Sequence, residues 1–279
     1  MENQSNKRII LGIDASTSCL GTSIAIYENG KLDIKVVNYC KMKVPKKING
    51  TEALFWKSKL FKDEFISKYK NIGITDVVIE EPLVSSPKNT NTVATLLRFN
   101  GMISQSIYEA LGVIPQYISS YDARKYAFPE LMAVRKFTKK GDLQPKTHIK
   151  HSLKYNELVL FGSYPFDCAK KNILWNMIAE RYPQLSWQYN KKGDLKVENF
   201  DASDSLICIL GFIGKEKYKD CEPKITDYTY LDENDIFQAK YTVEFCDQVF
   251  EKTIDCGEIL QIDENGVIVE ENPEYICEE

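Results

Sequence analysis

Four acidic residues of this 279-residue chain stand where their side chains could act together. Asp201 and Asp204 lie three residues apart at the start of the apolar run DASDSLICILG, so on a helix they share one face. Asp14 and Glu80 each end a short apolar run, IILGID and DVVIE, that predicts a buried strand. Carboxylates brought close together repel one another unless a cation lies between them.

The metal chemistry that suits such a set is specific. Oxygen-only ligands select Mg²⁺, or Mn²⁺ in its place, over softer metals. Two such ions about 3.5–4 Å apart can clamp the attacking and leaving oxygens of a phosphodiester displacement. Asp14, Glu80, Asp201 and Asp204 are therefore the predicted metal ligands and catalytic acids of a two-metal site.

Each acid also has an ordinary explanation. Asp14 could begin a turn with the serine and threonine that follow it. Glu80 could be a solvated acid at a strand end. Asp201 could be an N-cap, with Asp204 in a position like that of a capping box. Glu81 is an alternative ligand to Glu80, and because strand side chains alternate between faces, only one of the two can serve.

Two lysines follow a predicted helix start in DCAKKN. Asp167 would cap this helix and place Lys170 and Lys171 in its first turn. The helix dipole disfavours cations there, whereas a phosphate is favoured. The two lysines either contact an anionic ligand or solvate the helix end, and the sequence leaves both interpretations open.

The elements that must position these residues follow in a clear order. An opening strand precedes two β-rich runs joined by Asn29-Gly30, a strong hairpin signal. The predicted elements are strands at 8–14, 75–82 and 113–119 and helices at 51–70 (with Thr51 as N-cap), 87–111, 167–182 and 201–214. This order predicts an α/β fold in which three antiparallel strands are followed by parallel strands in βαβ crossovers. Cys208 and Gly211 continue the face of the two aspartates, and we expect these small residues to let the last helix lie close to the sheet.

The charge divides the chain into two parts. Residues 1–214 hold 30 Lys and Arg against 21 Asp and Glu, whereas residues 215–279 hold 6 against 19. We expect a nuclease domain at 1–214 with a basic insertion at about 120–166, followed by an acidic C-terminal extension at 215–279 that is small and β-rich or partly disordered. The basic insertion, with its interleaved aromatic side chains, suits contact with phosphates and bases, or it is a solvated loop. The acidic extension would dock a protein partner or inhibit the nuclease domain.

The stretches IILGIDASTSCLGTSIAI, VVIEEP and DASDSLICIL, in this order, resemble the RuvC family of Holliday junction resolvases in the RNase H-like superfamily. The resemblance covers about residues 8–214 and implies an RNase H-like mixed sheet flanked by helices. It also implies a homodimer that cuts four-way DNA junctions with two Mg²⁺ ions. Asp14, Glu80, Asp201 and Asp204 fall on the family's acidic positions. Lys125, with Arg124, falls where the family carries a basic element near the scissile phosphate.

Other classes resemble parts of the same sequence. The opening GIDASTSCLGTSIAI is similar to the phosphate-binding hairpin of the sugar-kinase and actin superfamily. That fold needs a duplicated half with a second hairpin, for which Asp255-Cys256-Gly257 is the only candidate and lies too near the end. Another RNase H-like DNA nuclease, of the packaging or repair type, is the remaining alternative. The Lys-, Tyr- and Asn-rich composition suits an AT-rich genome, such as a viral one.

The remaining features concern the cell compartment. No apolar run reaches 18 residues, so no membrane span is predicted. The N-terminus has no long apolar stretch or small-residue cleavage site typical of a signal peptide. The eight cysteines are scattered without a Cys-x-x-Cys motif, which favours free thiols in a reducing compartment over a disulfide framework. We expect a cytoplasmic protein, in a bacterium or an infected host cell.

Overall fold

The computed structural model describes most of the chain. The described residues are 7–82, 90–132, 148–152, 157–161, 171–233, 236–255, 261–262 and 268–270. They divide into two compact units: residues 1–127 with 174–217, and residues 128–173 with 218–279. The boundary expected at 214 thus lies close to the end of the first unit's last segment. The proposed basic insertion at about 120–166 overlaps the beginning of the second unit.

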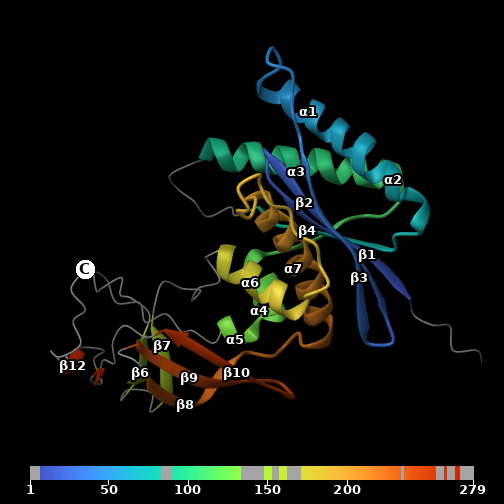
Figure 1. Cartoon of the computed structure of the whole chain (residues 1–279). Helices are drawn as coiled ribbons and strands as arrows, with labels where there is room; N and C mark the ends of the chain where they lie inside the picture. The colour runs from blue at the N-terminus through green and yellow to red at the C-terminus, as the bar shows by residue number, and fades with distance from the viewer. Residues whose placement is uncertain are drawn as a thin grey trace, which may run out of the picture. The chain divides into compact units, whose positions relative to one another are not determined.

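The first unit is built on a five-stranded sheet with the order β3-β2-β1-β4-β5 (Figure 1). Its strands are β1 (Arg8–Ala15), β2 (Cys19–Glu28), β3 (Lys31–Lys41), β4 (Asp76–Glu80) and β5 (Gln116–Ile118). β2 runs antiparallel to β1 and β3, while β4 is parallel to both β1 and β5. Three antiparallel strands followed by parallel ones are the RNase H-like arrangement, so the predicted fold class is confirmed.

The turn between β2 and β3 forms as the sequence predicts. Asn29 and Gly30 both have positive φ, 51° and 76°. Two consecutive residues in this region are what a tight hairpin turn with the sheet's right-handed twist requires. Asn-Gly supplies them at little steric cost, and this sets the register in which Glu28 pairs with Lys31.

The helices expected in the first unit begin and end within a few residues of the predicted positions, whereas the helix at Ser120–Ala127 was not predicted. The helical elements of this unit are α1 (Gly50–Phe61), a π-helical turn (Lys62–Ile66), α2 (Ser67–Tyr69), a 3-10 turn (Lys70–Ile72), α3 (Thr90–Leu111), α4 (Ser120–Ala127), α6 (Lys171–Arg181) and α7 (Glu198–Lys217). The division between the two units falls inside α6. The prediction of Thr51 as N-cap is wrong, because Asn49 holds that position and makes no side-chain capping bond.

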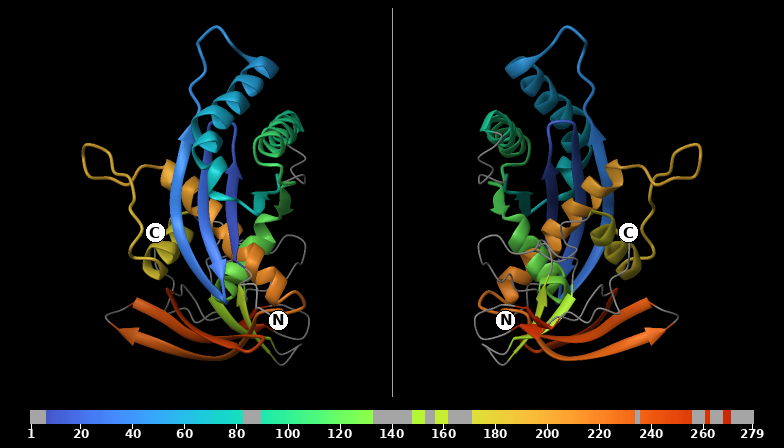
Figure 2. Two further views of the ribbon diagram at one scale, coloured as in Figure 1. Left: turned by 90° about the vertical axis from the view of Figure 1, so that its right-hand side faces the viewer. Right: turned by 90° about the vertical axis from the view of Figure 1, so that its left-hand side faces the viewer.

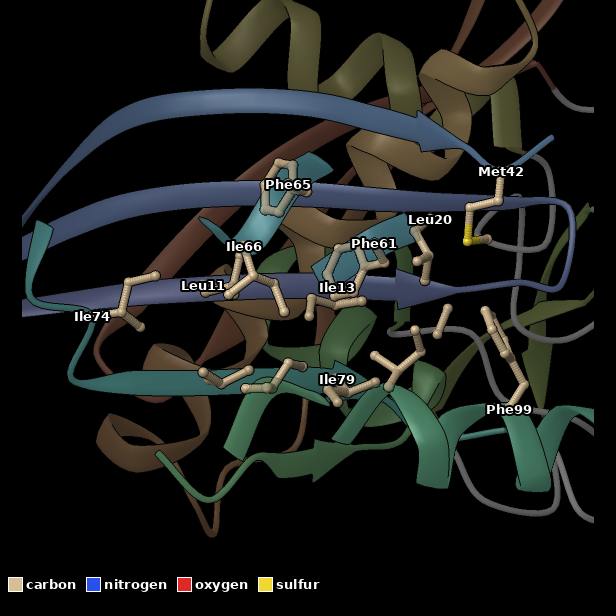
Figure 3. Close-up of a cluster of buried hydrophobic side chains, with 14 of the residues drawn as sticks. Leu11, Ile13, Leu20, Met42, Phe61, Phe65, Ile66, Ile74, Ile79 and Phe99 are labelled. Atoms are coloured by element: carbon tan, nitrogen blue, oxygen red, sulfur yellow. The ribbon is translucent and has the colours of Figure 1, made fainter. Parts of the chain in front are cut away.

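The main apolar core lies on one face of this sheet (Figure 3). Alternate residues of the strands, among them Leu11, Ile13 and Ile79, pack against Phe61 of α1 and Phe99 of α3. All five side chains are essentially excluded from solvent. Because strand side chains alternate, this core also fixes which residues point to the opposite face.

α7 lies on that opposite face, in contact with β1 and β2. A Cβ at Gly12 would collide with the Ser205 carbonyl, and one at Gly21 with the Asp201 carbonyl. The close approach therefore depends on glycines of the strands. The expectation that Gly211 lets α7 approach the sheet is wrong, because Gly211 packs against the backbone of Ala123 in α4.

The described part of the second unit is mostly β-structure. Its elements are α5 (Pro129–Met132), β6 (His148–Ser152), β7 (Glu157–Phe161), β8 (Lys224–Glu233), β9 (Ile236–Phe245), β10 (Gln248–Asp255), β11 (Gln261–Ile262) and β12 (Ile268–Glu270). β8, β9 and β10 form an antiparallel sheet, and the other four strands form a second sheet in the order β12-β11-β6-β7.

Cysteine pairing differs from the expectation in one place. Cys221, just after α7, and Cys246, in the β9–β10 turn, form a disulfide with their Cα atoms 5.7 Å apart. The expectation of thiols throughout is wrong for this pair, which tertiary folding brings together from 25 residues apart. Cys19, Cys40 and Cys208 are free. Within the described residues, no helix has the length and apolar character needed to cross a bilayer.

Candidate functional site

Asp14 and Glu80 lie at the same edge of the central sheet. Asp14 is the penultimate residue of β1 and Glu80 is the last residue of β4. These strands are parallel and adjacent, with Ile13 level with Ile79, so the next position of each strand carries one of the two acids. Ile13 and Ile79 belong to the core on one face, and therefore both acids point to the other face, where α7 lies.

The two aspartates of α7 face this edge from above the sheet. α7 begins at Glu198, so Asp201 lies inside its first turn and the N-cap explanation for Asp201 is wrong. The carbonyl of Asp201 lies against Gly21, which is the β2 partner of Asp14. Asp204 is only 5% exposed, an unusual environment for a carboxylate that needs polar or charged partners.

A buried serine pair fixes the height of α7 over the sheet. The hydroxyls of Ser23 in β2 and Ser205 in α7 lie 2.7 Å apart, and both residues are inaccessible to solvent. Ser205 also donates to the carbonyl of Ala202, one turn earlier. A polar contact inside an otherwise apolar interface has one correct register, so it helps to hold Asp201 and Asp204 over the strand ends.

Three of the acids act electrostatically on one thiol. Burial raises the pKa of Cys208 on α7, and the charges of Glu80, Asp14 and Asp204 raise this pKa further. The charge of Arg124 in α4 acts in the opposite direction. A coulombic effect on a common buried atom requires that all these groups lie near it. Cys208 therefore lies within electrostatic reach of acids from β1, β4 and α7.

Asp201, the fourth acid, acts on a second buried thiol, that of Cys19. Cys19, at the start of β2, is hydrogen-bonded to the side chain of Asp201. Burial raises the pKa of Cys19, and the nearby charges of Asp201, Glu198 and Asp14 raise it as well. A thiol kept protonated in this way can donate to a carboxylate. Asp14 thus lies within electrostatic reach of both thiols.

The side chain of Ser16 closes the β1–β2 turn. The Ser16 hydroxyl donates to the carbonyl of Cys19 over 2.7 Å and accepts from the Cys19 amide over 3.1 Å. From α1, the ammonium of Lys57 donates to the carbonyl of Thr17 at the tip, 2.5 Å away. These contacts hold the hairpin at Ser16 and Thr17, just after Asp14.

The four acids suit a metal ion by their chemistry but not by their spacing in this structure. All four groups are carboxylates, which is the donor chemistry that suits Mg²⁺ or Mn²⁺. Among the described residues, however, no three His, Cys, Asp or Glu side chains are gathered closely enough to hold an ion as they stand. The acids thus share a face and a neighbourhood without forming a finished coordination shell.

The predicted basic residues lie in different places. Arg124 is near enough to influence Cys208. Lys125 is 5% exposed, and its ammonium lies 5.1 Å from the centre of the Tyr126 ring. α4 packs on α7 through Ala123, and residues two apart on a helix point about 200° apart, so Lys125 does not share that face.

The other predicted residues are less closely tied to the acids. Lys171 is exposed and begins α6, while Lys170 lies outside the described residues, as does much of the basic region at 120–166. Glu81 follows the end of β4, is exposed, and donates its amide to the carbonyl of Ile118. The structure therefore favours Glu80 over Glu81 as a member of the acidic group.

Sequence reasoning gave the two thiols no part in the site. The sequence predicts Cys208 only as a small residue on the helix face of the two aspartates, four residues after Asp204. Both Cys19 and Cys208 are buried. The hydrogen bond from Cys19 to Asp201 crosses from β2 to α7 and has no counterpart in local sequence.

Comparison with known proteins gives distant structural likenesses. Thermus thermophilus RuvC matches with a TM-score of 0.44 and 10% identity over 75% of this chain and 95% of that chain. The same protein in complex with a Holliday junction substrate matches with a TM-score of 0.43. The Aquifex aeolicus member of the Ppx/GppA family matches with a TM-score of 0.31 and 11% identity, over 64% and 62% of the two chains. No protein-family model and no curated protein matches the sequence.

Proposed function

We propose that this chain is a divalent-metal-dependent DNA endonuclease of the RNase H-like type that cuts four-way junctions. The observation that carries the proposal is that Asp14 and Glu80 end two adjacent parallel strands on the face of the sheet covered by α7, the helix that carries Asp201 and Asp204. This arrangement gathers four carboxylates at one edge of the sheet. Their repulsion is relieved when a divalent cation binds.

Asp14, Glu80, Asp201 and Asp204 would hold Mg²⁺, with Mn²⁺ as a substitute. Once bound, the metal would supply an activated water and stabilise the departing oxygen of a phosphodiester. The part played by this chain is to fix the carboxylates on rigid elements and to exclude water from their inner side. Arg124 would add positive charge beside the phosphate, with Lys170 or Lys171 as proposed partners of the phosphate, whereas the buried Lys125 lies off the face of α4 that packs on α7.

The fold context supports a nuclease over a kinase. The kinase interpretation requires a second copy of the βββαβαβ half. In the part of the second unit that the structure describes, the sheets have the orders β10-β9-β8 and β12-β11-β6-β7, and neither repeats β3-β2-β1-β4-β5. The candidate second hairpin at Asp255 falls at the end of β10, with Cys256 and Gly257 outside the described residues.

The proposal extends to the assembly. A junction presents two opposed strands, so two copies of the acidic site are needed for symmetric cutting, and we propose a homodimer. The acidic segment 215–279 would dock a protein partner or compete with DNA. Removing it should tighten non-specific DNA binding, and unchanged affinity would exclude the competing role.

The test is cleavage of an immobile four-way junction beside a linear duplex of the same sequence, with Mg²⁺ and then with EDTA. Symmetric nicking of the junction alone, lost in EDTA, is the expected result. Asp201→Asn should reduce the rate by about 1,000-fold, because several kcal/mol of charge stabilisation depend on the metal. Junction binding should persist in this variant.

A matched control is Asp63→Asn, which changes an exposed aspartate of the same unit that pairs with Lys59. It should cut at the normal rate. If Asp201→Asn also cuts normally, the site is assigned wrongly; if the unaltered protein transfers phosphate from ATP to a sugar and leaves DNA intact, the kinase alternative holds instead.

A further inference from the structure

A group of lysines lies at the same edge of the sheet as the acids, on the side of β3. β1, β3 and β4 run in one direction, so Lys41 ends β3 at the edge where Asp14 and Glu80 lie. The segment 38–47, NYCKMKVPKK, holds four lysines and no acid. It continues from β3 into the connection that leads to α1.

A second basic segment lies beside the first. Residues 188–198, QYNKKGDLKVE, hold three lysines and two acids just before and at the start of α7. The hydroxyl of Tyr39 donates to Gln188 over 2.8 Å, and Lys41 forms an ion pair with Glu198. These contacts join the two segments, and Figure 2 shows the second, in yellow to orange, projecting from the flank of the sheet at which β3 lies.

The second segment ends in a well-defined hairpin. Tyr189 and Leu195 form a β-bridge, and the turn is closed by Asn190. The Asn190 side-chain carbonyl accepts from the amides of Lys192 and Asp194 over 2.8 and 3.0 Å, and its amide donates to the Asp194 carboxylate. The turn itself thus uses the hairpin's acid, and no lysine is needed to pair with it.

Most of these lysines have no acidic partner. Glu198 is paired with Lys41 and Asp194 with Asn190. The lysines left without an ion pair among the described residues are Lys43, Lys46, Lys47, Lys191, Lys192 and Lys196, which we call the β3-edge surface. Five of them are exposed, and Tyr189 beside them is 52% exposed. Unpaired cations next to an exposed aromatic ring are typical of nucleic-acid contact.

The β3-edge surface lies a short distance from the acids. Asp14, Gly21 and Tyr39 are successive partners across β1, β2 and β3. Two strand spacings separate Tyr39 from Asp14 by about 10 Å. Tyr39 joins the two lysine segments, so these segments meet at about this distance from Asp14.

We infer that the β3-edge surface binds the phosphate backbone of a duplex arm of the DNA, on the β3 side of the bond that is cut. This inference rests on the proposed nuclease function for the position of the cut. The chemistry recognised is that of the sugar–phosphate backbone, so the contact carries no base preference. It would hold the arm while the acids act on the neighbouring phosphate.

The experiment measures affinity of the full-length chain for a fluorescent four-way junction by anisotropy, in EDTA, over a range of salt concentrations. Two triple variants remove the surface in parts: Lys43→Gln with Lys46→Gln and Lys47→Gln, and Lys191→Gln with Lys192→Gln and Lys196→Gln. Each lost phosphate contact should reduce the magnitude of the slope of log affinity against log salt by about 0.9. The slope of each triple variant should therefore be smaller in magnitude by about 2–3 than that of the unaltered chain. Affinity near 0.1 M salt should fall by about 100- to 1,000-fold.

The matched control is Lys7→Gln with Lys31→Gln and Lys70→Gln. These three exposed lysines lie near the opposite end of the sheet, next to the start of β1, at the first residue of β3 and before β4. The control removes the same charge, and its affinity should change less than twofold. Replacing Lys43, Lys46 and Lys47 with arginine should keep the affinity of the unaltered chain.

The outcomes separate this inference from the nuclease proposal. If both triple variants bind as the control does while the unaltered chain cuts the junction, the β3-edge surface is not a DNA contact and the nuclease proposal stands. If the unaltered chain cuts no DNA but the triple variants lose affinity and salt slope, the surface is a DNA contact of a protein with another activity.

Discussion

The backbone of Gly21 in β2 lies directly against the main-chain carbonyl of Asp201 in α7. This contact brings the helix that carries two acids onto the strand that pairs with Asp14. Any side chain at position 21 would have to push α7 away. The positions of Asp201 and Asp204 therefore depend on the close packing of α7 on β2.

Gly21→Ala should destabilise the protein by about 1–3 kcal/mol, because the added methyl overlaps backbone atoms that cannot turn aside. Junction cleavage should fall further than stability alone explains, since Asp201 and Asp204 move with α7. Urea unfolding and single-turnover cleavage below the unfolding range measure the two effects.

The control for this change is Gly101→Ala in the exposed face of α3, where a Cβ would meet nothing within 4 Å. This variant should gain up to about 1 kcal/mol from helix propensity and cut normally. Equal behaviour of the two variants would show that the contact at Gly21 does not set the position of α7.

Glu80→Gln and Glu81→Gln form a second matched pair. Glu80 ends β4 on the face of α7 and acts on Cys208, whereas Glu81 is exposed beyond the strand. We expect Glu80→Gln to slow cleavage by at least about 100-fold, as the loss of a charged group at a preorganised site does. Glu81→Gln should leave the rate within about twofold, and the reverse pattern would make Glu81 the functional acid.

Cys19 provides a test of how Asp201 is held. Its thiol is hydrogen-bonded to the Asp201 carboxylate. Cys19→Ala removes the donor and should reduce cleavage by about 10–100-fold, as the loss of a group that orients a ligand does. Cys19→Ser keeps a donor and should retain most of the activity.

Cys40→Ala is the corresponding control, because Cys40 is half-buried on β3 and the acid near it is Glu64, outside the site. The metal concentration for half-maximal cleavage should rise in Cys19→Ala and stay unchanged in Cys40→Ala. A Cys19→Ala variant with normal metal dependence would show that the thiol does not position Asp201.

The acid sensitivity of the fold should depend on Arg8. Arg8 donates to Asp76 over 2.8 and 3.0 Å and to Glu216 over 2.6 Å, which joins β1, β4 and α7. Burial raises the pKa of Asp76, but hydrogen bonds from Arg8 and Thr75 and the charge of Arg8 outweigh it, so this pKa is lowered. The stabilisation is therefore complete above about pH 3.9, the unfolded value, and is lost as the pH falls through the lower folded value.

Arg8→Gln should cost about 1–3 kcal/mol at neutral pH, because hydrogen bonds to charged groups are lost from a partly buried pair. It should also flatten the fall in stability below about pH 4. Urea unfolding midpoints between pH 3 and pH 7 measure both effects. Lys62→Gln, which breaks the exposed pair with Glu109, should change neither, and an unaltered acid profile in Arg8→Gln would contradict the assignment.

Much of the first unit's fold could be predicted from local sequence. The Asn29-Gly30 turn, the apolar strand at 8–14 and the helix around Asp201 each depend on residues close in the chain. Boundaries were less accurate: α7 begins at Glu198, three residues before Asp201, where the sequence had placed its start. This earlier start excludes the capping explanation that the sequence had left open for Asp201.

By itself the sequence determined which acids lie at strand ends and on one helix face, because periodicity of two and of 3.6 residues is a local property. Only the tertiary structure decided that α7 packs on the face to which Asp14 and Glu80 point, and that Cys19 and Cys208 lie among the acids. It also decided that the segment that carries Lys43 and the segment that carries Lys191 lie together at one edge of the sheet. Such neighbours are set by the packing of distant segments, for which the spacing of residues along a chain carries no direct signal.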